Sequence, residues 1–127
     1  MRRLVWLVVV LVACEVGLFY MRNSELVALS RPVDVLAADP AFAQTAKAAL
    51  AREQVSRYVL EHIADVAARQ QDHPLQLAAL DRIARTAPDD RAVQIRRADI
   101  LRVLGRLAES EAVYRAQLAG EPLGARQ

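Results

Sequence analysis

Hydrophobic and polar residues follow two different patterns along the chain. Between Leu4 and Met21 the sequence is apolar, with one acidic residue inside it. From about residue 40 onward, apolar residues recur every three or four positions, which places them on one face of an α-helix. This pattern predicts helices over residues 40–54, 56–70, 74–86, 90–104 and 107–119. No stretch alternates as a strand does, so we expect an all-α fold, a transmembrane helix followed by about five helices.

The breaks between the expected helices carry residues that suit helix ends. Asp39 and Pro40 suit the N-cap and the first helical position, and Asp90 suits another N-cap. Gly105 can end a helix in the left-handed conformation. Pro32 disfavours helix at the residue before it, so the stretch "SRPVDVLAAD" reads as a linker. The expected divisions are an anchor over 1–22, a juxtamembrane helix end and linker over 23–39, a helical domain over 40–122 and a tail over 123–127.

The N-terminal apolar stretch has the length of a membrane span. Leu4 to Met21 is 18 residues, and a spanning helix needs about 20, with a range of roughly 17–25. Arg2 and Arg3 precede it, which predicts a cytoplasmic N-terminus. Trp6 and Tyr20 lie near its ends, where aromatic rings favour the membrane interface. We therefore expect a single-pass protein of the inner membrane with its body in the periplasm, or outside the cell.

Glu15 is the unusual residue of this stretch. An acidic residue at the centre of a spanning helix costs about 2.5–3.5 kcal/mol on insertion scales. Protonation or snorkelling eases that cost. The functional alternative is a contact between Glu15 and a basic or polar group on a partner's helix.

Cys14, the only cysteine, raises a second possibility for the N-terminus. The residues "LVAC" resemble a bacterial lipobox, in which a peptidase cuts before a lipid-modified cysteine. The short leader and the apolar "VGLFYM" after Cys14 favour an uncleaved anchor instead. A third alternative is a cleaved signal peptide and a soluble product. All three place the body across the membrane.

One spacing recurs between the prolines of the body. The interval from Pro40 to Pro74 is the same as that from Pro88 to Pro122. Paired short helices with a period of about 34 residues are typical of the tetratricopeptide repeat, and the chain resembles that family. The residues that match one repeat are Ala98, Leu101, Gly105, Ser110, Tyr114, Leu118 and Pro122, and those that match one period earlier include Ala64, Ala67, Leu80, Ala84 and Pro88.

The array reads as half a repeat followed by two full ones. Gln94 and Arg97 stand where the family prefers large apolar residues, Gln76 where it prefers a small one, and Gln117 replaces another apolar residue. The alternative architecture is an ordinary helical bundle whose proline spacing is a coincidence.

The resemblance implies a partner-binding groove on the first helix of each pair. Carried over by position, this groove contains Tyr58, Glu61, His62, Asp65 and Arg69 from one repeat, and Ala92, Ile95, Arg96, Asp99 and Arg102 from the next. The mixed charges suggest a polar groove. The run of lysines and asparagines with which some members grip a C-terminal carboxylate is missing, so that ligand is not implied.

The end of the array is expected to be uncovered. Members of the family usually carry a capping helix after the last repeat, and "GEPLGARQ" is too short and irregular to form one. The last helix would then leave Ala112, Tyr114 and Leu118 partly exposed. We expect another chain to cover this end, either a second copy or a subunit of a membrane complex.

The composition argues against a nucleic-acid partner and indicates what kind of core to expect. The chain has 17 basic and 15 acidic residues, a net charge of +2, and the two signs alternate, as in "PDDRAVQIRRADILR". Nucleic-acid binders usually show a basic face, so we expect no nucleic-acid partner. The 24 alanines and six aromatic residues indicate a thin core made by close approach of helices.

The residues offer little for catalysis. His62 and His73 have no third ligand at metal spacing, and His62 and Asp65 can form a surface ion pair on one helix. Glu109 and Glu111 are two apart and point to different faces of a helix. We expect no enzyme activity, no cofactor and no metal site.

The expected function is that of a membrane-anchored adaptor for other proteins of a larger system. Two rivals remain. One is a structural subunit that contacts its complex through the spanning helix and Glu15. The other is an outer-membrane lipoprotein scaffold.

Overall fold

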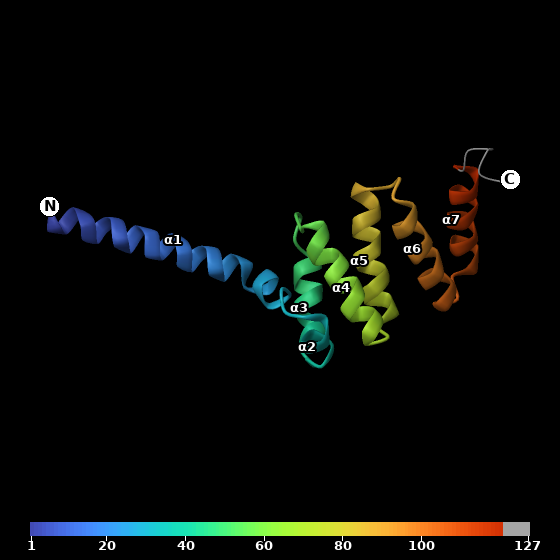
Figure 1. The fold of residues 1–127 in the computed structure, drawn as a ribbon, viewed down its shortest axis with the longest axis horizontal. Helices are drawn as coiled ribbons and strands as arrows, with labels where there is room; N and C mark the ends of the chain where they lie inside the picture. The colour runs from blue at the N-terminus through green and yellow to red at the C-terminus, as the bar shows by residue number, and fades with distance from the viewer. Residues whose placement is uncertain (121–127) are drawn as a thin grey trace.

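The computed structural model describes residues 1–120, apart from the side chains of residues 22–26. Within this part the chain forms seven α-helices and no strand (Figure 1). They are α1 (Arg2–Ala28), α2 (Val33–Ala37), α3 (Phe42–Leu50), α4 (Arg57–Arg69), α5 (His73–Thr86), α6 (Arg91–Val103) and α7 (Leu107–Ala119). The all-α prediction is therefore confirmed for the described residues.

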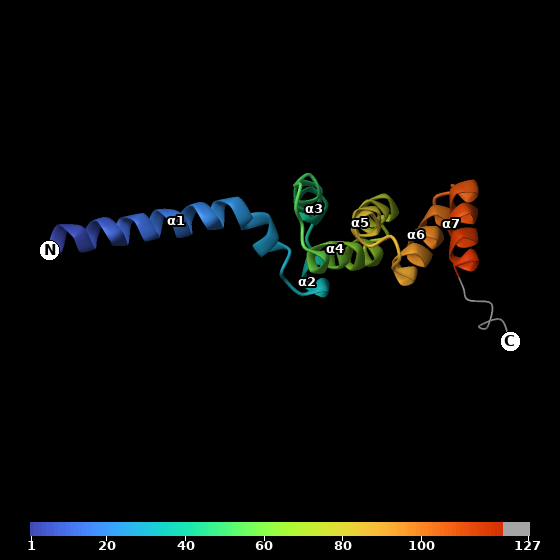
Figure 2. The same ribbon diagram turned by 90° about the horizontal axis from the view of Figure 1, so that it is seen from above.

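The helices after α1 form a row. The long helix α1 extends away from the others, and α7 lies at the opposite end of the row (Figure 1). Seen from above, α2 and α4 lie on one side of the row and α3 and α5 on the other, and α6 and α7 stand side by side at its end (Figure 2). Within the row α4 packs on α5 and α6 on α7, and α5 packs on α6 to join the two pairs.

The pairs α4–α5 and α6–α7 begin and turn at positions separated by the same interval as the prolines. Ser56 and Asp90 are the N-caps of α4 and α6, and each side chain accepts a backbone N–H three residues later. The turns within the pairs contain Gln71, with φ 56°, and Gly105, with φ 79°. Each turn closes with a bond of 2.9 Å, from Asp72 N–H to the Ala67 carbonyl and from Arg106 N–H to the Leu101 carbonyl.

Small residues lie where the helices approach each other. Ala64, Ala67, Ala79 and Ala98 have no exposed surface. Between α6 and α7 the Ser110 hydroxyl donates to the Ala98 carbonyl over 2.7 Å, so the helix backbones are close enough for a side chain to bridge them. The largest fully buried side chains fill the space between neighbouring helices; they are Phe42, Leu29, Ile63, Leu80, Ile83 and Val66.

The segment expected to be a linker is built into the body. Helix α1 continues to Ala28, and Leu29, which is 1% exposed, joins the core. The short helix α2 lies within the expected linker and buries Leu36. Pro32 is the N-cap of α2, so this proline both ends one helix and begins the next.

Helix α3 is shorter than expected at both ends. Pro40 and Ala41 lie in a turn in which the Asp39 carboxylate accepts the Ala41 N–H over 2.9 Å. At the other end, the Arg82 guanidinium donates to the carbonyls of Leu50, Arg52 and Glu53, the last two over 2.9 and 3.2 Å. These bonds satisfy carbonyls that a longer helix would have paired internally.

The N-terminal part of α1 has the properties of a membrane span. Arg2–Met21 is a 20-residue apolar helix with a mean hydropathy of 2.4, and none of it is buried against the rest of the molecule. By length and composition, this helix can cross a membrane.

Candidate partner-binding face

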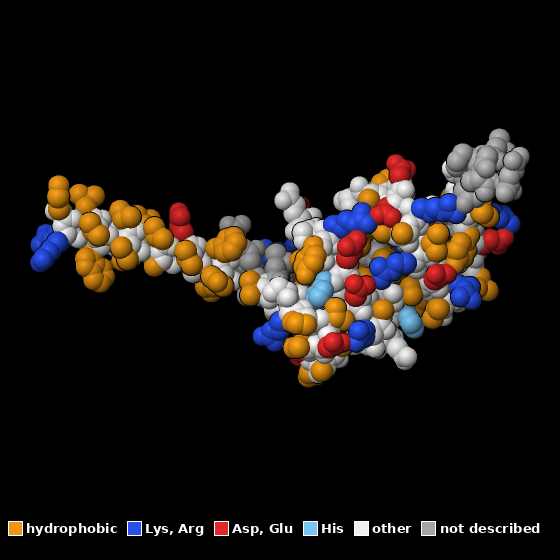
Figure 3. All heavy atoms as spheres, viewed as in Figure 1, with side chains coloured by type: hydrophobic (Ala, Val, Ile, Leu, Met, Phe, Trp, Pro, Cys, Tyr) orange, Lys and Arg blue, Asp and Glu red, His pale blue; other side chains and the backbone are white. Residues whose placement is uncertain are grey.

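The predicted groove residues lie on two helices of the row. Five of them are on α4, namely Tyr58, Glu61, His62, Asp65 and Arg69, and five are on α6, namely Ala92, Ile95, Arg96, Asp99 and Arg102. Ion pairs join α4 to both α2 and α6, and we call the surface of these three helices the α2–α4–α6 face. Acidic and basic side chains are interspersed over the body in the space-filling view (Figure 3).

Three charges of the predicted groove, Asp65, Arg69 and Arg96, form ion pairs between neighbouring helices. Arg69 of α4 pairs with Asp34 of α2. Arg96 of α6 donates to Asp65 of α4 over 3.2 Å. These pairs connect α2 to α4 and α4 to α6 on the surface of the row.

Asp90 takes part in two interactions, one within α6 and one between α4 and α6. It caps α6 by accepting the Val93 N–H over 3.3 Å, and it pairs with Arg57 of α4. The bond from Arg57, followed by the bond from the Val93 N–H, lowers the pKa of Asp90 below its usual value. Arg57 also bonds Glu61 over 2.8 Å, and its own pKa is raised by Glu61 first and Asp90 second.

His62 contacts the junction with α1 rather than Asp65. Its Nε2 lies 2.6 Å from the Arg31 carbonyl, and since a carbonyl only accepts, Nε2 is the donor. Its ring stacks on Tyr58 with centroids 5.9 Å apart and an interplanar angle of 14°. The expected His62–Asp65 ion pair is therefore replaced by these contacts and by the Asp65–Arg96 pair. Tyr58 is 66% exposed and presents an aromatic surface beside the charged pairs.

Asp99 connects the α2–α4–α6 face to the last helix. It accepts a hydrogen bond from the Tyr114 hydroxyl of α7. That bond raises the pKa of the Tyr114 hydroxyl. The burial of Tyr114 and the negative charge of Asp99 raise this pKa further. Arg102, one turn further along α6, is exposed.

The outer surface of α7 is more polar than the sequence suggested. Ala112 and Leu118 are exposed, whereas Tyr114 is half-buried and bonded to Asp99. Glu111 and Arg115 form an ion pair on this helix. At the equivalent positions of the preceding pair, α5 carries the buried Leu77 and the half-buried Asp81, which accepts a hydrogen bond from Arg97 of α6 over 2.8 Å. Glu111 and Arg115 of α7 therefore stand where α5 has the residues that face the next pair of helices.

The sequence reading missed a polar connection between the two pairs. Gln94 of α6 is 8% exposed, and its amide donates to the Pro88 carbonyl over 3.0 Å. Its oxygen accepts from Arg97 over 2.7 Å, and Arg97 also bonds Asp81. Gln94 and Arg97, two of the four departures from the expected repeat pattern, thus bond each other. Only their spacing of three residues on one helix could have suggested this bond.

No protein-family model, curated protein or solved structure matches the chain. What this chain does is therefore inferred from its own residues.

Several acidic side chains form ion pairs or helix caps where the structure describes them. No group of three or more His, Cys, Asp or Glu that could hold a metal ion occurs among the described residues. Glu109 is held by Arg106 at 2.6 and 2.9 Å, which lowers the pKa of Glu109. His73 is the first residue of α5. On α1, Cys14 is a free, exposed thiol, and Glu15 is exposed.

Proposed function

We propose that the protein is a membrane-anchored adaptor, similar to tetratricopeptide-repeat proteins, that serves as an accessory or assembly factor of a larger inner-membrane or periplasmic system. One observation carries this proposal. Two helical pairs, with caps and turns at equivalent positions, stand in a row behind an unburied apolar helix.

The backbone details support the proposed repeat. A period of about 34 residues with two helices per unit is that of the tetratricopeptide repeat. In such arrays each unit contacts its neighbours, and stacking of units supplies the stability. The packing of α5 on α6 between the two pairs agrees with this organisation.

The α2–α4–α6 face is the proposed binding surface. Its ion pairs are exposed; the side chains of Arg96 and Asp65 are 40% and 53% exposed, and those of Arg69 and Asp34 are 61% and 77% exposed. Exposed pairs of this kind contribute about 0–1 kcal/mol, so charged groups of a partner can replace them at low cost. Tyr58 adds an aromatic contact. The partner that fits is a polar protein segment with charges of both signs.

Site-specific photo-crosslinking in native membranes tests this proposal. A crosslinking amino acid at Tyr58 or Arg102 is expected to capture a discrete protein partner. The matched control is Ala78, an exposed residue on α5, a helix that does not belong to this face. Equal capture from Tyr58 and Ala78 would contradict a binding surface on the α2–α4–α6 face.

The alternative is a structural subunit held in its complex by the spanning helix. The observation in its favour is that Arg2–Met21 makes no buried contact within the chain and contains Glu15. A crosslinker at Leu11 separates the two, because capture confined to Leu11 supports the structural subunit. The lipoprotein scaffold requires a mature chain that starts at a lipidated Cys14, which the intact mass of the purified protein reveals.

A further inference from the structure

A hollow of about 560 Å³ lies between the turn that joins α3 to α4 and the C-terminal end of α5. Residues 53–56 of the turn form one wall with Leu60 of α4, and Arg82, Arg85 and Thr86 of α5 form the other. None of the predicted groove residues of α4 and α6 lines this hollow. Ligand sites commonly have volumes of about 300–1,000 Å³, so a few residues of a peptide fit into it.

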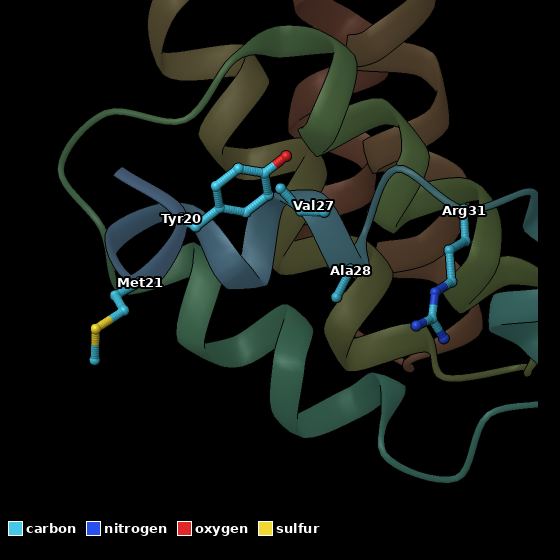
Figure 4. A pocket seen from close by; sticks show the side chains of 5 residues that line it. All are labelled: Tyr20, Met21, Val27, Ala28 and Arg31. Atoms are coloured by element: carbon cyan, nitrogen blue, oxygen red, sulfur yellow. The ribbon is translucent and has the colours of Figure 1, made fainter. Parts of the chain in front are cut away.

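Another hollow, of about 510 Å³, lies where α1 meets the body. The residues that line it are Tyr20, Met21, Val27, Ala28 and Arg31 (Figure 4). Residues 22–26, whose side chains lie outside the described part of the structure, belong to the same stretch of α1. We therefore infer a ligand only for the hollow beside the α3–α4 turn.

The α3–α4 turn offers backbone groups that the protein itself does not use. Gln54 and Val55 belong to no helix, and their N–H and carbonyl groups bond no described residue. At Ser56, the next residue, the backbone is extended, with φ −64° and ψ 148°. Arg82 fixes the turn, because its guanidinium donates to three carbonyls at and after the end of α3. A fixed stretch with free donors and acceptors can pair with the backbone of an extended peptide, as the edge of a sheet does.

Arg85 is the cation of the hollow that is left for a ligand. It is exposed, and its guanidinium forms no ion pair with any described residue. Arg82, by contrast, already donates to backbone carbonyls. Together with the exposed Glu53 of the turn, the two arginines give the lining a net charge of +1. A guanidinium presents several donors to a carboxylate in a fixed fork, so the charge favours an acidic group at Arg85.

We propose that this hollow binds an extended segment of another protein that carries one acidic residue. Arg85 pairs with the acidic side chain, and the free backbone groups of Gln54 and Val55 bond the backbone of the segment. The apolar surface of Val55 and Leu60 contacts a small apolar side chain next to the acidic residue. Glu53 disfavours a second acidic residue. The site is a second contact for the proposed adaptor, separate from the groove residues of the α2–α4–α6 face.

Binding of the full-length protein in detergent to immobilised pools of pentapeptides tests the site. Each pool has a fixed central residue, which is glutamate, glutamine or lysine, and a mixture of alanine, serine, threonine and valine at the other positions. We expect the glutamate pool to bind the protein about fivefold more tightly than the glutamine pool, as one exposed ion pair does, and the lysine pool to bind it least. A glutamate pool with methylated backbone nitrogens should bind no better than the glutamine pool, because it cannot donate to the carbonyls of Gln54 and Val55.

Two variants locate the binding. Arg85→Gln is expected to reduce binding of the glutamate pool to the level of the glutamine pool. The matched control is Arg102→Gln, which removes the same charge from the exposed surface of α6 and should bind as the wild type does. Both variants should melt close to the wild-type temperature, because both side chains are exposed.

Three results would overturn the inference. They are equal binding of the glutamate and glutamine pools, equal loss for Arg85→Gln and Arg102→Gln, and full binding of the methylated pool, which would indicate a site for free carboxylates. Photo-crosslinking from Tyr58 is read separately. Capture from Tyr58 without any preference among the pools refutes this inference alone. A glutamate preference that depends on Arg85, without capture from Tyr58, supports this site and contradicts the α2–α4–α6 face.

Discussion

Gly105 and Gln71 occupy equivalent turns, and both have positive φ. A side chain in the left-handed region costs about 1–2 kcal/mol, which glycine avoids. A Cβ on Gly105 would meet no atom within 4 Å, so backbone strain is the only cost of Gly105→Ala. We expect Gly105→Ala to destabilise the protein by about 1 kcal/mol and Gln71→Gly to stabilise it by at most about 1 kcal/mol. Thermal unfolding followed by circular dichroism measures both, and shifts of the same sign would contradict this account of the turns.

Asp90 predicts a dependence of stability on pH. Because the folded state lowers the pKa of Asp90, the carboxylate stabilises the protein above its unfolded pKa of about 4. That contribution is lost as the pH falls through the lowered pKa of the folded state. Asn caps helices as well as Asp does, so Asp90→Asn removes the charge and keeps the cap. We expect this variant to be less stable than the wild type at neutral pH, with the difference shrinking below about pH 4.

The neighbouring residue provides the control for this pH prediction. Asp89→Asn removes an exposed carboxylate next to the cap and should leave the pH profile close to that of the wild type. Unfolding in urea at a series of pH values gives the free energies. A constant difference between Asp90→Asn and the wild type at every pH would show that Asp90 stabilises through something other than its charge.

Residues whose role is set by their nearest neighbours were predictable from the sequence. Asp90 as an N-cap and Gly105 as a left-handed helix end follow from local backbone chemistry. Gln71 was not predictable, because nothing in its side chain favours positive φ. The ion pairs Arg69–Asp34 and Arg96–Asp65 were not predictable either, because their partners are 35 and 31 residues apart and meet only through the packing of helices.

At the scale of single helices, the C-terminal end of α1 decides how the proposed anchor is attached. Leu29 is 1% exposed, and α1 packs on α3, so the helix is continuous with the core. The sequence could not show this, since Pro32 reads equally well as the end of a helix and as the start of α2. The attachment is therefore a packed junction at Leu29 rather than a flexible linker.

Leu29→Ala tests this junction. Removing most of a buried leucine costs about 2–5 kcal/mol, which should lower the melting temperature of the body markedly. Val27→Ala is the matched control, since Val27 is 49% exposed and surface changes usually stay within about 0.5 kcal/mol.

Truncation of the chain tests the same junction. A body that starts at residue 32 lacks Leu29 and the Arg31 carbonyl that accepts from His62, and should melt lower than one that starts at residue 23. Equal melting temperatures of the two truncations would show that the junction contributes nothing.

At the scale of the whole molecule, α1 and α7 lie at opposite ends (Figure 1). With α1 in a membrane, the row of helices extends from the bilayer and α7 is its distal element. The Glu111–Arg115 pair makes the α7 surface partly polar, whereas the α2–α4–α6 face runs the length of the row. This arrangement favours partners that approach from the side of the row over partners that stack on its end.

The orientation of the chain in the membrane gives the last prediction. Arg2 and Arg3 precede the span, and basic residues favour the cytoplasmic side, so the body should face outward. Ala112 is exposed on α7, and Ala112→Cys in a Cys14→Ala background places the only thiol on the body. An impermeant thiol reagent added to intact spheroplasts should label this variant fully. Changing Arg2 and Arg3 to Glu should reduce the labelled fraction, because the charge bias that sets the orientation is then removed. Labelling only after lysis would place the body in the cytoplasm and would rule out a periplasmic adaptor, while leaving the packing of the row unchanged.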